Sequence, residues 1–141
     1  MRFGMVLTEL MIVLVLIGII ASIAVPRLSG MSDTAAVRVE ALRVVAALDA
    51  ARGAAVRLNT VASLTLSNTS YLAVAVVGSD TVIAWSQTGP IRNGVTLSGA
   101  GAPLLFGPAG LAMGVSNRTI TVTRGNAVRR VVMSRLGRIT Y

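Results

Sequence analysis

The feature that most constrains this chain is an apolar run near its N-terminus, from Met5 to Val25, which Pro26 closes. At a helical rise of about 1.5 Å per residue, a helix of this length covers roughly the hydrocarbon core of a bilayer. Glu9 is the one charged residue in the run. An ionised carboxylate in hydrocarbon is costly unless a partner neutralises it. We therefore expect the run to span a membrane and Glu9 to have a partner.

The residues around this run argue against an ordinary secretory signal peptide. Such a signal has a shorter apolar core, followed by a small-residue cleavage site, whereas this run ends in Val25-Pro26-Arg27. The N-terminus instead resembles that of type IV pilins and type II secretion pseudopilins. Their pattern is a basic leader that ends in glycine, an early glutamate, and a proline near the end of the apolar helix. The matching positions here are Arg2, Gly4, Glu9, Gly18 and Pro26.

The resemblance implies how the N-terminus is processed. A prepilin peptidase is expected to cut after Gly4 on the cytoplasmic face, and the new amino group of Met5 is expected to be methylated. Glu9 is then expected to pair with that amine, usually of a neighbouring subunit, during filament assembly. Gly18 and Pro26 are expected to break the helix.

Two residues depart from the family pattern. Met5 replaces the usual phenylalanine, and Thr8 stands where a large aliphatic residue is common. Neither change affects Gly4 or Glu9. A single-span anchor that never polymerises is the alternative interpretation.

A second helical pattern follows the apolar run. Ser32 or Asp33 could cap a renewed helix there. Beyond them, apolar residues recur in steps of three and four, at Val37, Ala41, Val44, Leu48, Ala51, Ala55 and Leu58. This spacing predicts one apolar face of a helix. The alanines on it favour close packing on a sheet over a coiled coil, and a continuous helix over 5–58 would be about 80 Å long.

Beyond Asn59 the pattern changes from helical to alternating, which is typical of strands. Turn residues rich in Gly, Asn, Asp and Ser separate the alternating segments. The predicted strands are 62–67, 71–77, 81–86, 119–123, 127–134 and 137–141, and of these 71–77 is a more continuous apolar run. Residues 89–110 show a less regular pattern, because several Gly and Pro residues interrupt their short apolar segments. A tight turn is expected at 124–126.

The fold class predicted from these patterns is α+β, with a long N-terminal helix packed on a C-terminal antiparallel β domain. The chain then has four segments: the cytoplasmic leader 1–4, the transmembrane helix 5–26, the amphipathic half of the helix 27–58 and the β domain 59–141.

The composition excludes most catalytic and metal chemistry. His and Cys are absent, so neither a Ser–His pair nor a thiolate metal site can form. Outside the apolar run the acids are Asp33, Glu40, Asp49 and Asp80. Three of them lie on the predicted helix, where they are better explained as a solvated face. Glu40 and Asp49 each have an arginine three residues later. We expect no enzymatic activity and no cofactor.

Positive charge is concentrated near the C-terminus. The net charge is +8, and all 13 basic residues are arginines. Six of them, with no acid between them, follow the loose segment: Arg118, Arg124, Arg129, Arg130, Arg135 and Arg138. Such a cluster could neutralise phosphates, although ordinary solvated arginines are the simpler interpretation. On a regular strand Arg129 and Arg130 point to opposite sides, so one of them is expected at an edge, at a bulge or in a subunit contact.

The last residues carry a second resemblance. Residues 130–141 are similar to the C-terminal strand pair of the GspH-type minor pseudopilins and FimT-like minor pilins. In FimT-like proteins of DNA uptake, a Gly-Arg-x-Arg element contacts DNA. Gly137 and Arg138 match it here, but Thr140 replaces the second arginine. Candidate DNA contacts are Arg124, Arg129, Arg130, Arg135, Gly137 and Arg138.

The function expected from these resemblances is that of a minor pilin or pseudopilin in a filament of a type II secretion system or type IV pilus. Its expected partners are other pilin or pseudopilin subunits, the prepilin peptidase and an inner-membrane assembly platform. The β domain would lie in the periplasm and the N-terminus in the cytoplasm. The alternative is a FimT-like minor pilin that binds DNA during natural transformation.

Overall fold

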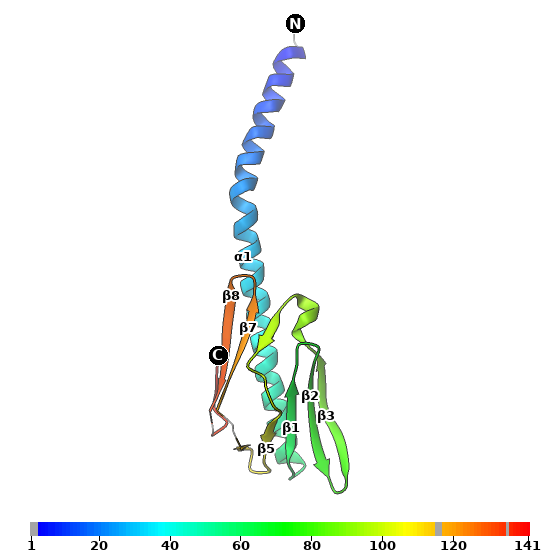
Figure 1. Cartoon of the computed structure of the whole chain (residues 1–141). Helices are drawn as coiled ribbons and strands as arrows, with labels where there is room; N and C mark the ends of the chain where they lie inside the picture. Colours follow the sequence, from blue (N-terminus) through cyan, green and yellow to red (C-terminus); the bar gives the residue numbers. More distant parts are fainter. Residues whose placement is uncertain (1–2, 115–116, 135) are drawn as a thin grey trace.

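The computed structural model describes residues 3–114, 117–134 and 136–141. One long helix, α1 (Phe3–Arg57), dominates it. The N-terminal half of α1 projects away from the rest of the chain, and its C-terminal half packs against a β domain (Figure 1). The α+β class predicted from the sequence is confirmed, and the helix ends one residue before the predicted boundary.

The expected helix breaks do not occur, because α1 runs through both Gly18 and Pro26. Proline in a helix interior removes a backbone donor and crowds the preceding turn, at a cost of about 3 kcal/mol. Long helical segments on both sides of Pro26 offset this local cost. Ser22 and Ser29 donate hydrogen bonds of 2.7 and 2.9 Å to carbonyls three residues earlier, and α1 curves but stays continuous (Figure 1).

The expected cap at Ser32 or Asp33 is also absent, because no new helix starts there. The next hydroxyl, that of Thr34, donates a hydrogen bond of 2.8 Å to the Gly30 carbonyl within α1. A Thr hydroxyl inside a helix can donate in this way to the carbonyl four residues earlier, whereas a capping hydroxyl would accept from a backbone N–H at the helix start. Ser32 and Asp33 therefore lie within one uninterrupted helix.

The β domain consists of two antiparallel sheets, a division that the alternation alone did not predict. The first has the strand order β3-β2-β1-β5-β6 and the second has the order β4-β7-β8-β9. The strands are β1 (Ala62–Leu66), β2 (Ser70–Val77), β3 (Asp80–Thr88), β4 (Thr96–Ser98), β5 (Leu104–Phe106), β6 (Ala112–Met113), β7 (Arg118–Arg124), β8 (Ala127–Met133) and β9 (Ile139–Thr140). A short 3-10 helix, η1 (Pro90–Asn93), precedes β4. Strands β4 to β6 have two or three residues each, too few to show an alternating pattern.

The core lies between the C-terminal half of α1 and the two sheets. The predicted apolar face of the helix is buried from Val37 to Ala55, whereas Leu58 lies beyond the helix end and is 44% exposed. Ala47 and Ala54 add to the buried face. These alanines let the backbone of the helix approach the sheets closely. The sheets contribute Leu64, Tyr71, Phe106, Ile120, Val131 and Met133.

Candidate functional site

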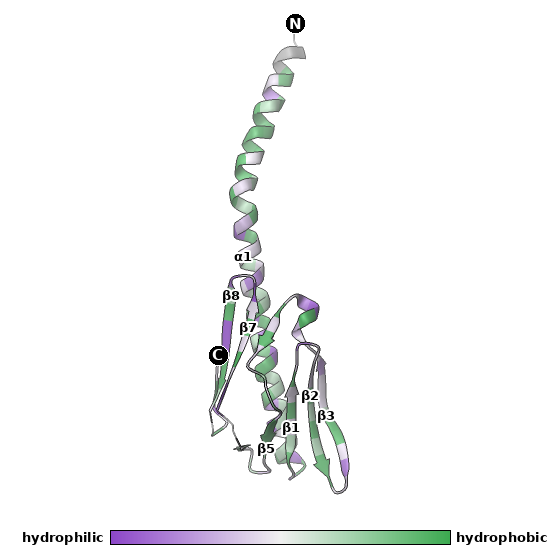
Figure 2. Ribbon diagram, viewed as in Figure 1, coloured by the Kyte–Doolittle hydropathy of each residue, from purple (hydrophilic) through white to green (hydrophobic). Residues whose placement is uncertain are grey.

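The N-terminal half of α1 is mostly apolar, with a few polar residues such as Glu9 between the hydrophobic ones (Figure 2). Within the described residues, α1 from Val6 onward is the one helix long and apolar enough to cross a membrane, with a mean hydropathy of 2.7 in its apolar stretch and no burial there. Such an exposed apolar surface requires lipid or protein around it.

Glu9 lies on this apolar half of the helix. Its side chain is exposed, and its apolar neighbours Val6 and Leu10 are 63% and 59% exposed. The described side chains form two ion pairs, and Glu9 takes part in neither of them. Gly4 and Met5, the expected cleavage and methylation sites, lie in the first turn of α1, and the Met5 side chain lies outside the described ones.

The C-terminal half of α1 has a second apolar face, which the sequence analysis missed. Met31, Val39 and Leu42 are 69%, 49% and 42% exposed. Residues two apart on an α-helix point to nearly opposite sides, so Val39 lies across the helix from the buried Val37. The outer stripe consists of Leu28, Met31, Ala35, Val39 and Leu42. Its steps of three and four residues were a signal that could have revealed it.

The buried face of α1 carries one charged residue, Glu40, which is 1% exposed. The Tyr71 hydroxyl of β2 donates a 2.8 Å hydrogen bond to Glu40 Oε1, and Arg43 Nη1 lies 3.2 Å from Oε2. Burial, followed by the hydrogen bond to Glu40, raises the pKa of Tyr71 well above its usual value. The expected ion pair between Glu40 and Arg43 is confirmed, but the expected solvated position of Glu40 is wrong, because a tyrosine distant in the sequence covers it.

Two of the clustered arginines bind their own chain. Arg118 Nη1 donates hydrogen bonds to the carbonyls of Ala100 and Ala102, in the loop before β5. Arg124 Nε pairs with Asp33 of α1 at 3.0 Å, and its Nη1 donates to the Asn93 carbonyl at 3.0 Å. Arg124 therefore connects the end of β7 to the helix and to η1.

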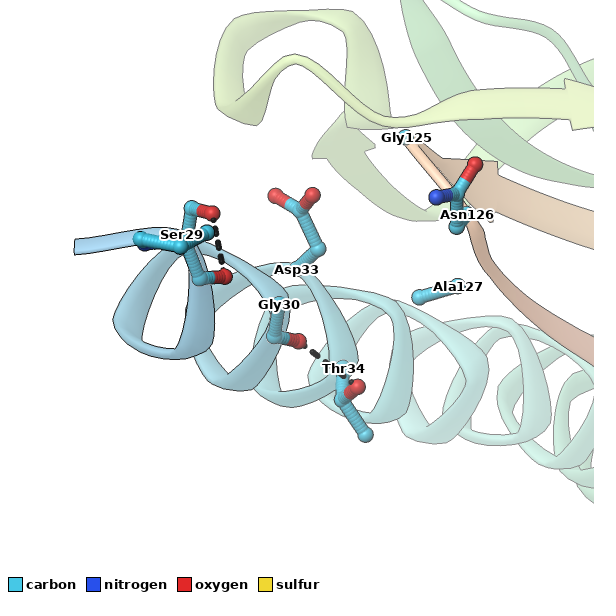
Figure 3. Close-up of a pocket in the computed structure, with 8 residues that line it drawn as sticks. Ser29, Gly30, Asp33, Thr34, Gly125, Asn126 and Ala127 are labelled. Atoms are coloured by element: carbon cyan, nitrogen blue, oxygen red, sulfur yellow. Dashed lines mark hydrogen bonds between the residues drawn. The ribbon is translucent and has the colours of Figure 1, made fainter. Parts of the chain in front are cut away.

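The Asp33 contact lies at a cleft of about 360 Å³ between α1 and the β7–β8 turn. In Figure 3, Asp33 projects from the helix on the side of Gly125. Gly125 has a φ of 54°, and a Cβ at this position would collide with the Asp33 carboxylate. The positive φ of the two-residue turn favours glycine, and a side chain at this position would also displace the Asp33 carboxylate. Among the described residues no group of three or more His, Cys, Asp or Glu lies close enough together to hold a metal ion.

Three other candidate contacts are exposed arginines. Arg129 and Arg130 lie on β8, and Arg138 precedes β9. No guanidinium group of these three arginines forms an ion pair or a hydrogen bond with the described residues, although the backbone N–H of Arg138 donates to the Ser134 hydroxyl at 3.2 Å. The strand β9 pairs with β8 only at Val132 and Met133, so Arg129 and Arg130 both lie on an open edge, as expected for at least one of them. Arg135 lies outside the described residues.

Gly137, the remaining candidate, has a structural role. Its φ is 76°, it is buried, and its N–H donates to the Ser134 carbonyl at 2.9 Å. A Cβ at this position would lie 3.6 Å from Arg52 Nη1 and from the Gly110 carbonyl. The turn between β8 and β9 therefore accounts for this glycine without any ligand.

Comparisons with known proteins identify the family. The family model described as type II transport protein GspH matches residues 40–137, more than half of the chain. No curated protein and no solved structure matches the chain. The matched region begins at the buried Glu40 and includes both sheets. The chain therefore belongs to the family of the type II transport protein GspH, whose members are structural pseudopilins of type II secretion.

Proposed function

We propose that this pseudopilin assembles through α1 into a filament of the type II secretion system, as a minor subunit at or near the tip. The observation that carries the proposal is the length of exposed apolar surface on α1, which continues from Val6 to Leu42. A helix of this length extends about 55 Å, whereas the hydrocarbon core of a bilayer is about 30 Å thick. The outer stripe beyond the bilayer therefore needs protein partners, and the helices of other subunits offer matching apolar surfaces.

The proposed route begins with the protein as a single-pass protein of the inner membrane, with a cytoplasmic N-terminus and a periplasmic β domain. The prepilin peptidase cuts after Gly4, and the amino group of Met5 is methylated. The assembly platform then transfers the subunit into the filament, where Glu9 pairs with the terminal amine of a neighbour. This pairing is favoured because it removes an isolated charge from an apolar environment. Mass spectrometry of the mature chain should find methylated Met5 at its start.

The test of this proposal is the Glu9→Ala variant in cells that assemble the filament. We expect its incorporation to fall at least about tenfold, because the pairing that draws the subunit out of the membrane is lost. Asp49→Ala is the matched control, since Asp49 is an exposed acid on the C-terminal half of the same helix. Incorporation of Glu9→Ala at the wild-type level would overturn the mechanism.

A second candidate function is DNA binding, as in FimT-like minor pilins. The observation that favours it is the exposure of Arg129, Arg130 and Arg138 without partners among the described residues. Phosphate contacts by such residues give affinity that falls steeply with salt. Gel-shift titration of the full chain in detergent at several salt concentrations tests this function. Absence of binding even at low salt would eliminate it.

A further inference from the structure

The strand β8 has an open edge beside the helix. It pairs with β7 along its whole length, from Ala127 to Met133, whereas β9 covers only Val132 and Met133. Over residues 127–131, β8 therefore has one strand partner within the described chain. An open edge presents backbone N–H and C=O groups that an added strand can bind.

A cleft runs along this edge. It has a volume of about 470 Å³ and lies between Thr34 and Val37 of α1, residues 127–130 of β8, and Tyr141. It shares Thr34 and Ala127 with the cleft at the β7–β8 turn (Figure 3). The two clefts together form one groove, which we call the β8 edge groove. It follows α1 from the β7–β8 turn to Tyr141, with the β8 backbone as one wall.

The charge of this groove is positive. Arg129 and Arg130 both line it, and both are exposed without a partner among the described side chains. The one acid at the groove, Asp33, is already paired with Arg124. Because neighbouring strand residues point to opposite sides, Arg129 faces the helix side of β8 and Arg130 faces the outer side. Two adjacent acids on an added strand would meet both arginines.

We propose that the β8 edge groove binds an extended acidic segment of another protein, which adds a strand to the second sheet beside β8. Another copy of this chain does not fit, because Asp80 is the only acid in residues 59–141. An extended peptide suits the groove better than DNA does, because a peptide pairs with the open backbone as well as with the arginines. The exposed Val128 and Val132 provide apolar contacts for its intervening residues. This proposal concerns the β domain and does not depend on filament assembly through α1.

The probe for this proposal is a labelled eight-residue peptide with two central glutamates flanked by valine and threonine. Its binding to the full chain in a zwitterionic detergent is measured by fluorescence anisotropy. We expect the variant with both Arg129→Glu and Arg130→Glu to bind it at least about tenfold more weakly. The matched control is Arg92→Glu, an exposed arginine on η1, which should bind within about twofold of the wild type.

Two further measurements separate strand addition from simple charge attraction. A peptide with the same charges but with proline at alternate positions cannot pair with the edge, and it should bind at least about tenfold more weakly than the probe. Hydrogen exchange should show new protection in residues 127–131 when the probe is bound. The variant with Arg129→Lys and Arg130→Lys should retain binding, which shows that charge and not misfolding explains the glutamate variant.

Three results would overturn the proposal. The proline peptide could bind as tightly as the probe, the probe could protect amides from hydrogen exchange only outside residues 127–131, or the glutamate variant could bind the probe as tightly as the wild type. Tighter binding of a short DNA duplex than of the peptide at equal salt would assign the groove to nucleic acid instead. If Glu9→Ala loses filament incorporation but still binds the peptide, the proposal for the β8 edge groove is unaffected. The proposal for the groove and the proposal for filament assembly can therefore fail independently.

Discussion

Glu9 and Glu40 lie on the same helix, but their surroundings are opposite. Glu40 is buried under β2, where it accepts a hydrogen bond from Tyr71 and pairs with Arg43. Glu9 is exposed among apolar side chains and pairs with no described side chain. Among the described side chains, the same residue type therefore has partners in the C-terminal half of α1 and no ion-pair partner in the N-terminal half. The difference teaches that one subunit buries the inner face of the C-terminal half of its helix, whereas the N-terminal half is left without such contacts.

The two faces of the helix near the domain show the same contrast. The inner face is rich in small residues such as Ala41, Ala47 and Ala51, which are fully buried against the sheets. The outer stripe carries the large residues Met31 and Leu42, which remain exposed. Small residues allow a helix to lie close to a fixed partner, whereas large apolar residues gain most from burial when a partner arrives.

The largest effect that tests this contrast is expected for Glu40→Ala. The substitution leaves the buried Tyr71 hydroxyl without its acceptor and Arg43 without its counter-charge. We expect it to lower the free energy of unfolding of the β domain by about 3 kcal/mol. Denaturant unfolding of the full chain in detergent, followed by tryptophan fluorescence, measures the change.

Glu9→Ala is the control within the same helix. It should change the unfolding free energy by less than about 0.5 kcal/mol, while it impairs incorporation into the filament. Equal destabilisation by the two substitutions would contradict the division of α1 into a half with internal partners and a half without them.

The sequence predicted the parts of the fold that repeat over many residues. The periodicity of Val37 and Val44 located the buried helix face, and alternation located the long strands. The environment of Glu40 was not predictable, because its hydrogen-bond partner Tyr71 lies 31 residues away in the sequence. The break expected at Pro26 failed because the local preference of one residue was outweighed by the long helix around it.

The candidate site was predictable to a smaller extent. The basic cluster was visible as composition, but its arginines looked alike until the fold separated them. Arg118 donates to carbonyls in a loop and Arg124 donates to a carbonyl in η1, and neither segment has a periodic pattern in the sequence. The open position of Arg129 and Arg130 depends on how short β9 is, and the strand predicted over 137–141 was longer than the two residues that form β9.

A smaller effect is expected for Tyr71→Phe, together with a distinct pH dependence. Without the hydroxyl, Glu40 loses a buried donor, so stability at neutral pH should fall by about 1 kcal/mol. In the unfolded wild type the Tyr71 hydroxyl loses its proton at about pH 10, whereas its raised pKa keeps it protonated in the folded protein. The unfolded state then binds fewer protons, so wild-type stability should fall above pH 10 by about 1.4 kcal/mol per pH unit.

Tyr71→Phe should remove this alkaline loss, and denaturant unfolding between pH 8 and about 11.5 would show a flatter curve. The matched control is Tyr141→Phe, because Tyr141 is 59% exposed. Its alkaline curve should follow that of the wild type. Parallel curves for wild type and Tyr71→Phe would contradict the burial of a protonated Tyr71 against Glu40.

The smallest effect is expected where the two halves of α1 meet, at the pair between Asp33 and Arg124. The side chains are 26% and 35% exposed, so solvent screens their attraction. A double-mutant cycle with Asp33→Ala and Arg124→Ala should give a coupling free energy of about 0.5 kcal/mol, which decreases further at high salt. Hydrogen exchange at the Gly125 turn should accelerate in Asp33→Ala, because the contact that holds the turn against the helix is lost. A coupling above about 2 kcal/mol, or one that salt leaves unchanged, would show a buried network here like that of Glu40, and the boundary between the two halves would then lie nearer to Pro26.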